Sequence, residues 1–297
     1  IEDKNGANRR HIQADLVVDC SGRESKLTDW LTSLGYMAPP EEVIDAHVGY
    51  ATRWYKEPPN FKADWLMMGT FPRPDQGIKR AAAILRVEDG QWSVIANGAD
   101  RDYPPTDEAG FLEFIKGVPT PEIAELIQQA EPITPIYGYR ATENRLRHYE
   151  KMTARPENVI AMGDAVCNFN PAYGQGMSVA GIEAGVLNEM LKQGELTPGF
   201  AGKFHRRIYS SIGDAWLLAT GGDLVYPDTT GPRPGMAARI VQKYMNRMIT
   251  VVTPHDTQAA TTFLRVMQMN TRPVALLSPV FMFKTLRYSL VKPAQQM

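Results

Sequence analysis

Residues 158–191, NVIAMGDAVCNFNPAYGQGMSVAGIEAGVLNEML, decide the fold that we expect for this chain. The first five residues form a short apolar run that is typical of a buried parallel strand. Residues 176–191 have the length and spacing of a helix, and their Gly and Ala residues let one flank lie close to a neighbouring strand. A strand, a Gly-Asp turn, a glycine-containing loop and a helix in this order predict part of an open α/β sheet.

The turn and the loop of this segment carry the residue types of a ligand site. Asp164 follows Gly163 at the carboxyl end of the strand, where ligands bind in open α/β sheets. The N–H groups at the start of the helix and its dipole favour negative charge, which suits the pyrimidine side of a flavin ring. The candidate cofactor-binding residues are Gly163, Asp164, Pro171, Gly174, Gln175, Gly176 and Met177. In the alternative interpretation, the segment is an ordinary strand–turn–helix and Asp164 is a helix cap.

The rest of the chain divides by pattern into four predicted regions. Residues 1–36 are expected to form part of an FAD-binding domain, with a buried strand at His11–Cys20 and a helix at Ser25–Leu34. Residues 37–150 form a substrate domain. Its strands are expected at Gly49–Tyr55, Trp65–Phe71, Arg80–Glu88 and Trp92–Asn97, and its helices at Thr106–Lys116 and Thr120–Ala130. Residues 151–194 return to the FAD-binding domain, and residues 195–297 form a helical C-terminal region. The fold class is therefore α/β, or α+β overall.

Composition excludes several classes of function. The 32 Lys and Arg residues nearly balance the 33 Asp and Glu residues, so no nucleic-acid partner is indicated. The five His residues have no ligand spacing, so no metal site is expected. Two cysteines, no secretory signal and no apolar run of membrane-spanning length favour the cytoplasm. Cys167 is interpreted as a small apolar filler, with a redox role as the less favoured alternative.

The motif GDAVCNFNPAYGQGM at residues 163–177 resembles the second FAD-binding motif of the flavoprotein aromatic-hydroxylase superfamily. ADLVVDCSGRESKL at residues 14–27 resembles the middle motif of that superfamily, with Ser21-Gly22 and Thr28 in place of the usual Asp-Gly and later Arg. The nearest group by resemblance is the bacterial FAD-dependent epoxidases and monooxygenases related to polyether epoxidases and squalene epoxidase. The resemblance implies that Asp164 binds the ribityl chain of FAD and that residues 174–177 face the pyrimidine side of the flavin.

The same resemblance implies a reaction. NAD(P)H reduces FAD, oxygen is captured as a flavin hydroperoxide, and an apolar substrate is epoxidised or hydroxylated; this chemistry requires no protein nucleophile, so no catalytic side chain is named. A flavin-dependent prenyl reductase or halogenase is the alternative within the cofactor class. Trp92-Ser93-Val94-Ile95-Ala96 has one Trp and no Pro, which counts against a halogenase. A non-catalytic flavin- or lipid-binding fragment is the alternative from another class.

Three further expectations concern the ends of the chain and its surfaces. The chain has no G-x-G-x-x-G, and it is expected to lack the front ADP-binding unit of a longer protein. The apolar segment Pro273–Leu290 is expected to close the substrate domain as a helix, with weak contact to a membrane surface as the alternative. Tyr50, Thr52 and Trp54 share one face of a strand; packing of the aromatics against helices is favoured over a role as the roof of a substrate pocket.

Overall fold

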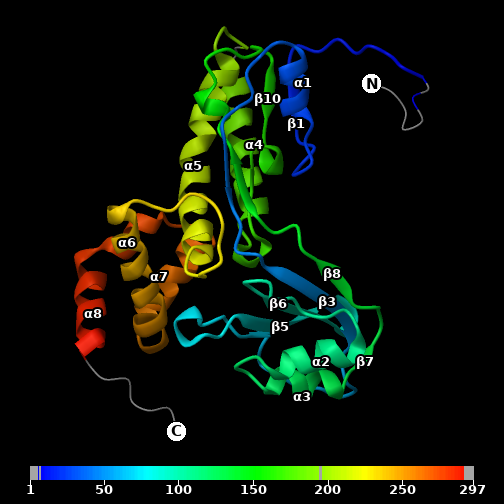
Figure 1. Ribbon diagram of the computed structural model, residues 1–297, viewed down its shortest axis with the longest axis vertical. Coiled ribbons are helices and arrows are strands. Elements are labelled where there is room, and N and C mark those ends of the chain that lie inside the picture. The colour runs from blue at the N-terminus through cyan, green and yellow to red at the C-terminus, as the bar shows by residue number, and fades with distance from the viewer. Residues whose placement is uncertain (1–5, 7, 194–195, 291–297) are drawn as a thin grey trace. The chain divides into compact units, whose positions relative to one another are not determined.

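The structure is a computed structural model that describes residues 6, 8–193 and 196–290 (Figure 1). The chain forms two compact units. The first contains Ile1–Glu42, Arg145–Leu218 and Pro234–Met297, and the second contains Val43–Asn144 and Ala219–Arg233. The assignment of the predicted FAD-binding and substrate domains to these units stays a prediction.

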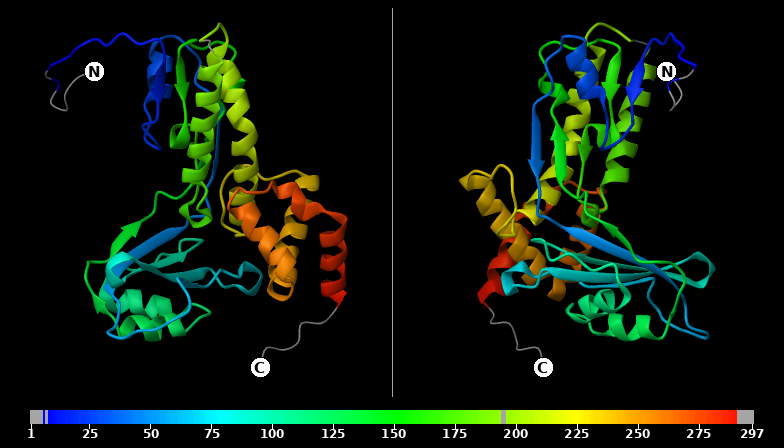
Figure 2. Two further views of the ribbon diagram at one scale, coloured as in Figure 1. Left: turned by 180° about the vertical axis from the view of Figure 1, so that it is seen from behind. Right: turned by 45° about the vertical axis from the view of Figure 1, so that its right-hand side comes forward.

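The second unit is built on an antiparallel sheet with the strand order β4-β5-β6-β3-β7, in which β8 also pairs with β3. The strands are β3 (Gly49–Lys56), β4 (Met67–Gly69), β5 (Arg80–Val87), β6 (Gln91–Gly98), β7 (Glu131–Pro132) and β8 (Tyr137–Tyr139). Helices α2 (Glu108–Lys116) and α3 (Glu122–Gln128) lie together on one face of the sheet, as both views of Figure 2 show.

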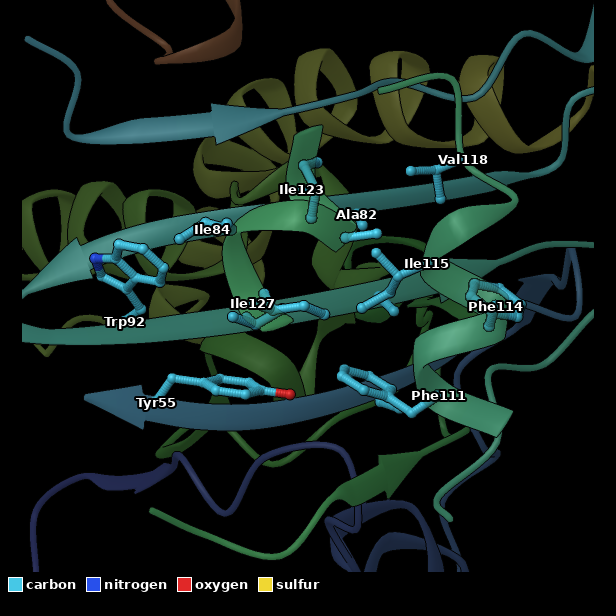
Figure 3. Packing of buried hydrophobic residues seen from close by; sticks show 14 of the residues in the cluster. Tyr55, Ala82, Ile84, Trp92, Phe111, Phe114, Ile115, Val118, Ile123 and Ile127 are labelled. Atoms are coloured by element: carbon cyan, nitrogen blue, oxygen red, sulfur yellow. The ribbon is translucent and has the colours of Figure 1, made fainter. Parts of the chain in front are cut away.

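The core of the second unit lies between this sheet and its two helices. Trp92, Ile84 and Ala51 have no exposed surface and point toward the helices. Phe111 and Ile115 of α2 meet them from the other side, and Figure 3 shows these side chains converging. Strand residues alternate between the two faces, so the buried positions follow the period of two that the sequence predicted.

Two local signals act as the sequence predicts. Asp89 and Gly90 have φ angles of 58° and 63°, so both residues of the hairpin turn are left-handed, as the twist of a tight hairpin requires. Asp107 caps α2, since its side chain accepts a hydrogen bond from the N–H of Gly110.

The first unit contains a parallel pair of strands, β1 (Val17–Asp19) and β10 (Val159–Ala161). Val17 lies opposite Val159 and Asp19 opposite Ala161, so both strands end at the same edge. The helices of this part are α1 (Leu27–Ser33), α4 (Gly176–Lys192) and the portion of α5 (Phe200–Asp223) up to Leu218. A small three-stranded sheet has the order β11-β9-β2, with β11 (Cys167–Asn168), β9 (Asn144–Arg147) and β2 (Glu41–Ile44).

The C-terminal part of the first unit is helical, as expected. Its helices are α6 (Met236–Arg247), α7 (Thr257–Met267) and α8 (Pro279–Leu290), which pack around Met248, Val252, Val266 and Phe281. Short 3-10 or π-helical turns complete the elements at Pro74–Gln76, Glu88–Gly90, Tyr149–Lys151, Gly163–Ala165, Pro171–Tyr173, Met248–Val252, Thr253–His255 and Pro273–Leu277. No helix in the described part of the chain combines the length and the apolar character needed to cross a bilayer.

The expected mixed α/β fold is confirmed, whereas several boundaries differ. The first strand is three residues long, because Arg9–Ala14 forms no ladder, and the strand predicted at Trp65–Phe71 is limited to β4. The short strands β2, β7, β8, β9 and β11 were not predicted, since two to four residues carry too little periodicity to be read from sequence.

The predicted packing of Tyr50 and Trp54 against helices is wrong. Ala51 and Tyr55 of the same strand face α2 and α3. Tyr50 packs instead against a separate small cluster that contains Val48 and Tyr226, and 36% of Trp54 is exposed.

Candidate functional site

Asp164 lies in the turn that ends β10, and its side chain is exposed. Gly163 before it has a φ of 63°, a left-handed conformation that glycine adopts without strain. Among the described residues, none donates a hydrogen bond to the Asp164 carboxylate, and this side chain caps no helix. Partial burial raises the pKa of Asp164, and the Arg23 guanidinium acts in the opposite direction. The carboxylate is therefore available to a ligand.

The start of α4 lies beside this carboxylate. A Cβ atom added to Gly176 would lie 3.7 Å from Oδ1 of Asp164, which places the carboxylate next to the first turn of the helix. The preceding turn, Pro171–Tyr173, is held by the side chain of Asn170, which accepts from the N–H of Ala172. Gly174 then takes a φ of 66° and redirects the chain into α4. The N–H groups of the first turn of this 17-residue helix thus begin near Asp164.

Two side chains at this helix start differ sharply in burial. Gln175 is 1% exposed, and neither of its amide atoms has a hydrogen-bond partner among the described residues. A buried amide without partners is costly, so a polar ligand at this position would stabilise it. Met177 is 89% exposed and offers an apolar surface next to it. Of the predicted residues, the structure brings Gly163, Asp164 and Gly176 together.

The segment after β1 ends at the same edge of the sheet, because β1 and β10 are parallel neighbours. Asp19 is already used there: its Oδ1 accepts from the N–H of Ser21 at 3.0 Å and from its hydroxyl at 2.6 Å, and its Oδ2 accepts from Ser25. Asp19 therefore builds the turn that presents Arg23, the cation that acts on Asp164. The sequence analysis did not single out Arg23. The signal that could have found it is the parallel pairing of β1 with β10, which brings the turns after both strands to the same edge of the sheet.

Glu183 is a second site residue that the sequence did not indicate. It lies within α4 with no exposed surface, and its Oε2 accepts a hydrogen bond from the N–H of Gly163 at 2.5 Å. Its pKa is raised to about 7, mainly by burial and also by the charge of Asp164, while the Gly163 hydrogen bond acts in the opposite direction. Nearby, Cys167 is buried as expected, and burial raises the pKa of its thiol well above the usual value, which keeps it protonated.

The other side of β10 is held by a buried histidine. The N–H of Ala161 donates to Nε2 of His205 on α5 at 3.2 Å, and the ring stacks on Tyr149. Burial lowers the pKa of His205 to about 4, with the charge of Arg155 acting in the same direction. His205 is therefore a neutral structural residue.

A surface cavity of about 380 Å³ lies at the opposite end of β10. Met152, Arg155 and Glu157, which precede the strand, line it together with Gly199 and Arg206 around the first turn of α5. Ligands of open α/β sheets bind at the carboxyl ends of the strands, so we place the candidate site at Asp164 instead.

The second unit offers an aromatic sheet face. In the ladder between β3 and β8, Tyr50 is opposite Tyr139 and Thr52 is opposite Tyr137, and residues directly opposite share one face. Tyr137 and Tyr139 are exposed, and this face points away from α2 and α3.

Three basic side chains at β9 and directly after it form ion pairs. Arg145 and Arg147 both contact Glu41, and His148 contacts Glu150 through Nδ1 at 2.6 Å. Arg140 instead lies over the ring of Tyr103.

Comparison with known proteins shows the fold. The flavin-dependent brominase Bmp2 is 14% identical, with a TM-score of 0.57 over 95% of this chain and 65% of that one. HpxO of Klebsiella pneumoniae, solved with FAD and uric acid, is 14% identical, with a TM-score of 0.56 over 96% of this chain and 62% of that one. CmlS, a flavin-dependent halogenase, is 14% identical, with a TM-score of 0.53 over 80% of this chain and 44% of that one. The chain thus has the mixed α/β fold of these flavoproteins.

In sequence, the chain is similar to protein Rv3254 of Mycobacterium tuberculosis (strain ATCC 25618 / H37Rv). The two are 32% identical over 222 residues, which is 74% of this chain and 46% of Rv3254. The chain therefore spans about half the length of this curated relative. No protein-family model matches it.

Proposed function

We propose that this chain carries part of the FAD site and the substrate-facing sheet of an FAD-dependent oxidoreductase. The observation that carries the proposal is Asp164, an exposed carboxylate without a hydrogen-bond partner among the described residues, next to the open start of α4. Solved proteins with the same fold include one with FAD bound. The residues here fit that group: Asp164 would accept from ribityl hydroxyls, while Gln175 and the N–H groups of α4 would face the flavin ring.

The proposed reaction is a monooxygenation, either epoxidation or hydroxylation, with NAD(P)H as the electron donor. FAD, when bound, supplies the redox and oxygen chemistry. The protein would bind and orient the substrate and exclude water. The aromatic sheet face with Trp54, Tyr137 and Tyr139 favours a small apolar substrate, because flat aromatic side chains bury apolar surface without demanding charge.

The test uses the complete protein, purified and freed of small molecules. A flavin absorbance spectrum that persists after desalting supports FAD binding, and its absence refutes the proposal. The rate of NAD(P)H consumption is then measured in the presence of prenyl or polyketide alkenes and compared with the rate in the presence of benzoate-type acids. We expect the alkenes to stimulate it more; stimulation by bromide or chloride with a halogenated product would instead identify a halogenase.

We also propose that the sheet β1-β10 continues in the complete protein. Both strands have an open edge among the described residues, and parallel sheets of two strands are rarely stable alone. The added strand would carry the G-x-G-x-x-G of an ADP-binding unit. Reading the coding sequence of the complete protein tests this, and a protein without such a segment contradicts it.

A weak contact between the C-terminal helices and an anionic membrane surface is a further part of the proposal. Val280, Phe283 and Leu286 lie on one side of α8 and are 55%, 66% and 61% exposed. Residues 236–290 contain seven Lys or Arg residues, at positions 239, 243, 247, 265, 272, 284 and 287, and one acidic residue, Asp256. Exposed apolar side chains among cations are typical of helices that lie on anionic lipid.

Sedimentation with lipid vesicles tests this contact. The protein should sediment with vesicles that contain phosphatidylglycerol and much less with phosphatidylcholine alone, and Phe283→Ser should weaken the interaction. Equal recovery with both vesicle types, or no effect of Phe283→Ser, argues against it. A dimer that dissociates in the Phe283→Ser variant would show that this side contacts protein instead.

A further inference from the structure

Glu183 occupies an unusual position for a carboxylate. It lies in the interior of α4 with no exposed surface, although charged side chains are almost never fully buried unless paired. The neighbouring positions Gly181, Ile182, Ala184 and Gly185 on the same helix are exposed. The glutamate is thus directed inward at a point where an apolar residue would be the ordinary choice.

Its inward contact is with the turn that presents Asp164. Gly163 is left-handed, and its N–H points to Oε2 of Glu183 at 2.5 Å. A Cβ atom on Gly163 would lie 3.7 Å from the Cβ of Ala180, one turn earlier on the same face of α4, so the helix lies directly against the turn. Without Glu183, the Gly163 N–H would lose this acceptor.

Burial, together with the charges around it, determines the protonation of Glu183. The other oxygen, Oε1, is buried and has no hydrogen-bond partner among the described residues. The titratable groups that act on this site are Asp164 in the turn, Cys167 on β11 and Cys20 after β1. All three are neutral or anionic; the Arg23 guanidinium acts on Asp164 but is not among the groups that shift the pKa of Glu183. A second negative charge beside Asp164 is therefore disfavoured, in agreement with a pKa of about 7 for Glu183.

We propose that Glu183 is a positioning residue. In the neutral, protonated form of its carboxyl group, Glu183 holds the Gly163–Asp164 turn. The carbonyl oxygen of the acid accepts from Gly163, so the turn is fixed without an added charge. The inference rests on the proposed function in one respect: the turn that it fixes presents Asp164 to FAD. Loss of the proton places a second anion next to Asp164 and against an anionic cofactor, which lowers FAD affinity.

The experiment measures FAD affinity of the complete protein by fluorescence titration at pH 6.0 and pH 8.5. The parent should bind about three- to tenfold more weakly at the higher pH, as expected when a ligand shifts a linked pKa by about half a unit to one unit. Glu183→Gln keeps a carbonyl acceptor and has no charge, so it should bind like the parent at pH 6.0 and show no loss at pH 8.5. Glu183→Leu should bind about tenfold more weakly at both values, since Gly163 loses its acceptor.

Glu189→Gln is the matched control. Glu189 lies on the same helix but is exposed, and it pairs with Arg207. This variant should keep the pH dependence of the parent. A parent without pH dependence, or a Glu183→Gln variant with the same dependence as the parent, overturns the proposal.

A second measurement separates this inference from the proposed function. The pKa of Glu183 is raised on folding, so its stabilising effect is fully present below about pH 4.5 and is lost as the pH rises through about 7. The melting temperature of the protein without FAD should therefore fall more between pH 5.5 and pH 8.5 for the parent than for Glu183→Gln. If no FAD binds at any pH, the proposed function fails, and the melting comparison still decides whether Glu183 is neutral. Identical melting profiles refute the inference even if FAD binds.

Discussion

Replacement of Asp164 by alanine tests the site most directly, because the structure separates its effect on binding from its effect on folding. The Asp164 carboxylate is exposed, accepts no hydrogen bond from a described residue and caps no helix. Asp164→Ala should therefore change the free energy of unfolding by less than about 0.5 kcal/mol, as for surface substitutions away from special contacts.

The effect on binding should be much larger. A hydrogen bond from a ribityl hydroxyl to a carboxylate is charge-assisted and contributes about 1.5–3 kcal/mol. Because each 1.4 kcal/mol corresponds to about a factor of ten, FAD affinity should fall by roughly ten- to a hundredfold. The assay is fluorescence titration of the complete protein with FAD, together with flavin retention after desalting and a thermal melt of the apoprotein.

Asp107→Ala provides the matched control. Asp107 is a true helix cap that accepts from the N–H of Gly110 at 2.8 Å, so its loss should destabilise the protein by about 1 kcal/mol and leave FAD affinity unchanged. An Asp164→Ala variant that keeps FAD as tightly as the parent, or that melts lower to the same extent as Asp107→Ala, would refute the assignment of Asp164 as a cofactor ligand.

Three further predictions concern stability. The pKa of His205 is lowered to about 4, mainly by burial, so its contribution to the free energy of unfolding is present above about pH 6.5 and is lost as the pH falls through about 4. This loss amounts to at most about 3 kcal/mol. Urea unfolding at pH 4 and pH 7 should show a smaller loss for His205→Gln than for the parent. Ile84 is fully buried in the sheet core, so Ile84→Ala should cost about 2–5 kcal/mol and Ile84→Val about 0.5–1.5 kcal/mol; equal costs would contradict this packing. Gly90→Ala should destabilise by about 1–2 kcal/mol because φ is 63°, whereas Gly213→Ala within α5 should stabilise by up to about 1 kcal/mol, although a Cβ meets open space at both positions. Thermal melts that show the same sign for both glycines would exclude backbone conformation as the cause.

Much of the fold could be predicted because its signals are local. The strands β3, β5 and β6 are each eight residues long, β6 buries every second residue, and the Asp89-Gly90 turn joins β5 to β6. The helix α4 was bounded nearly to the residue, since Gly176 opens it and its composition changes after Lys192. Periodicity and turn chemistry act between neighbours in the chain, so the sequence alone carries them.

The sequence by itself determined that Gly163, Asp164 and Gly176 belong to one strand–turn–helix segment. Only the tertiary structure decided what each side chain does there. It left Asp164 without a hydrogen-bond partner among the described residues and buried Glu183 against the N–H of Gly163. The burial of Glu183 depends on a contact between residues 20 positions apart and on the loss of solvent around them. Burial and charge balance are set by everything that packs around a group, and no local pattern in the sequence records them.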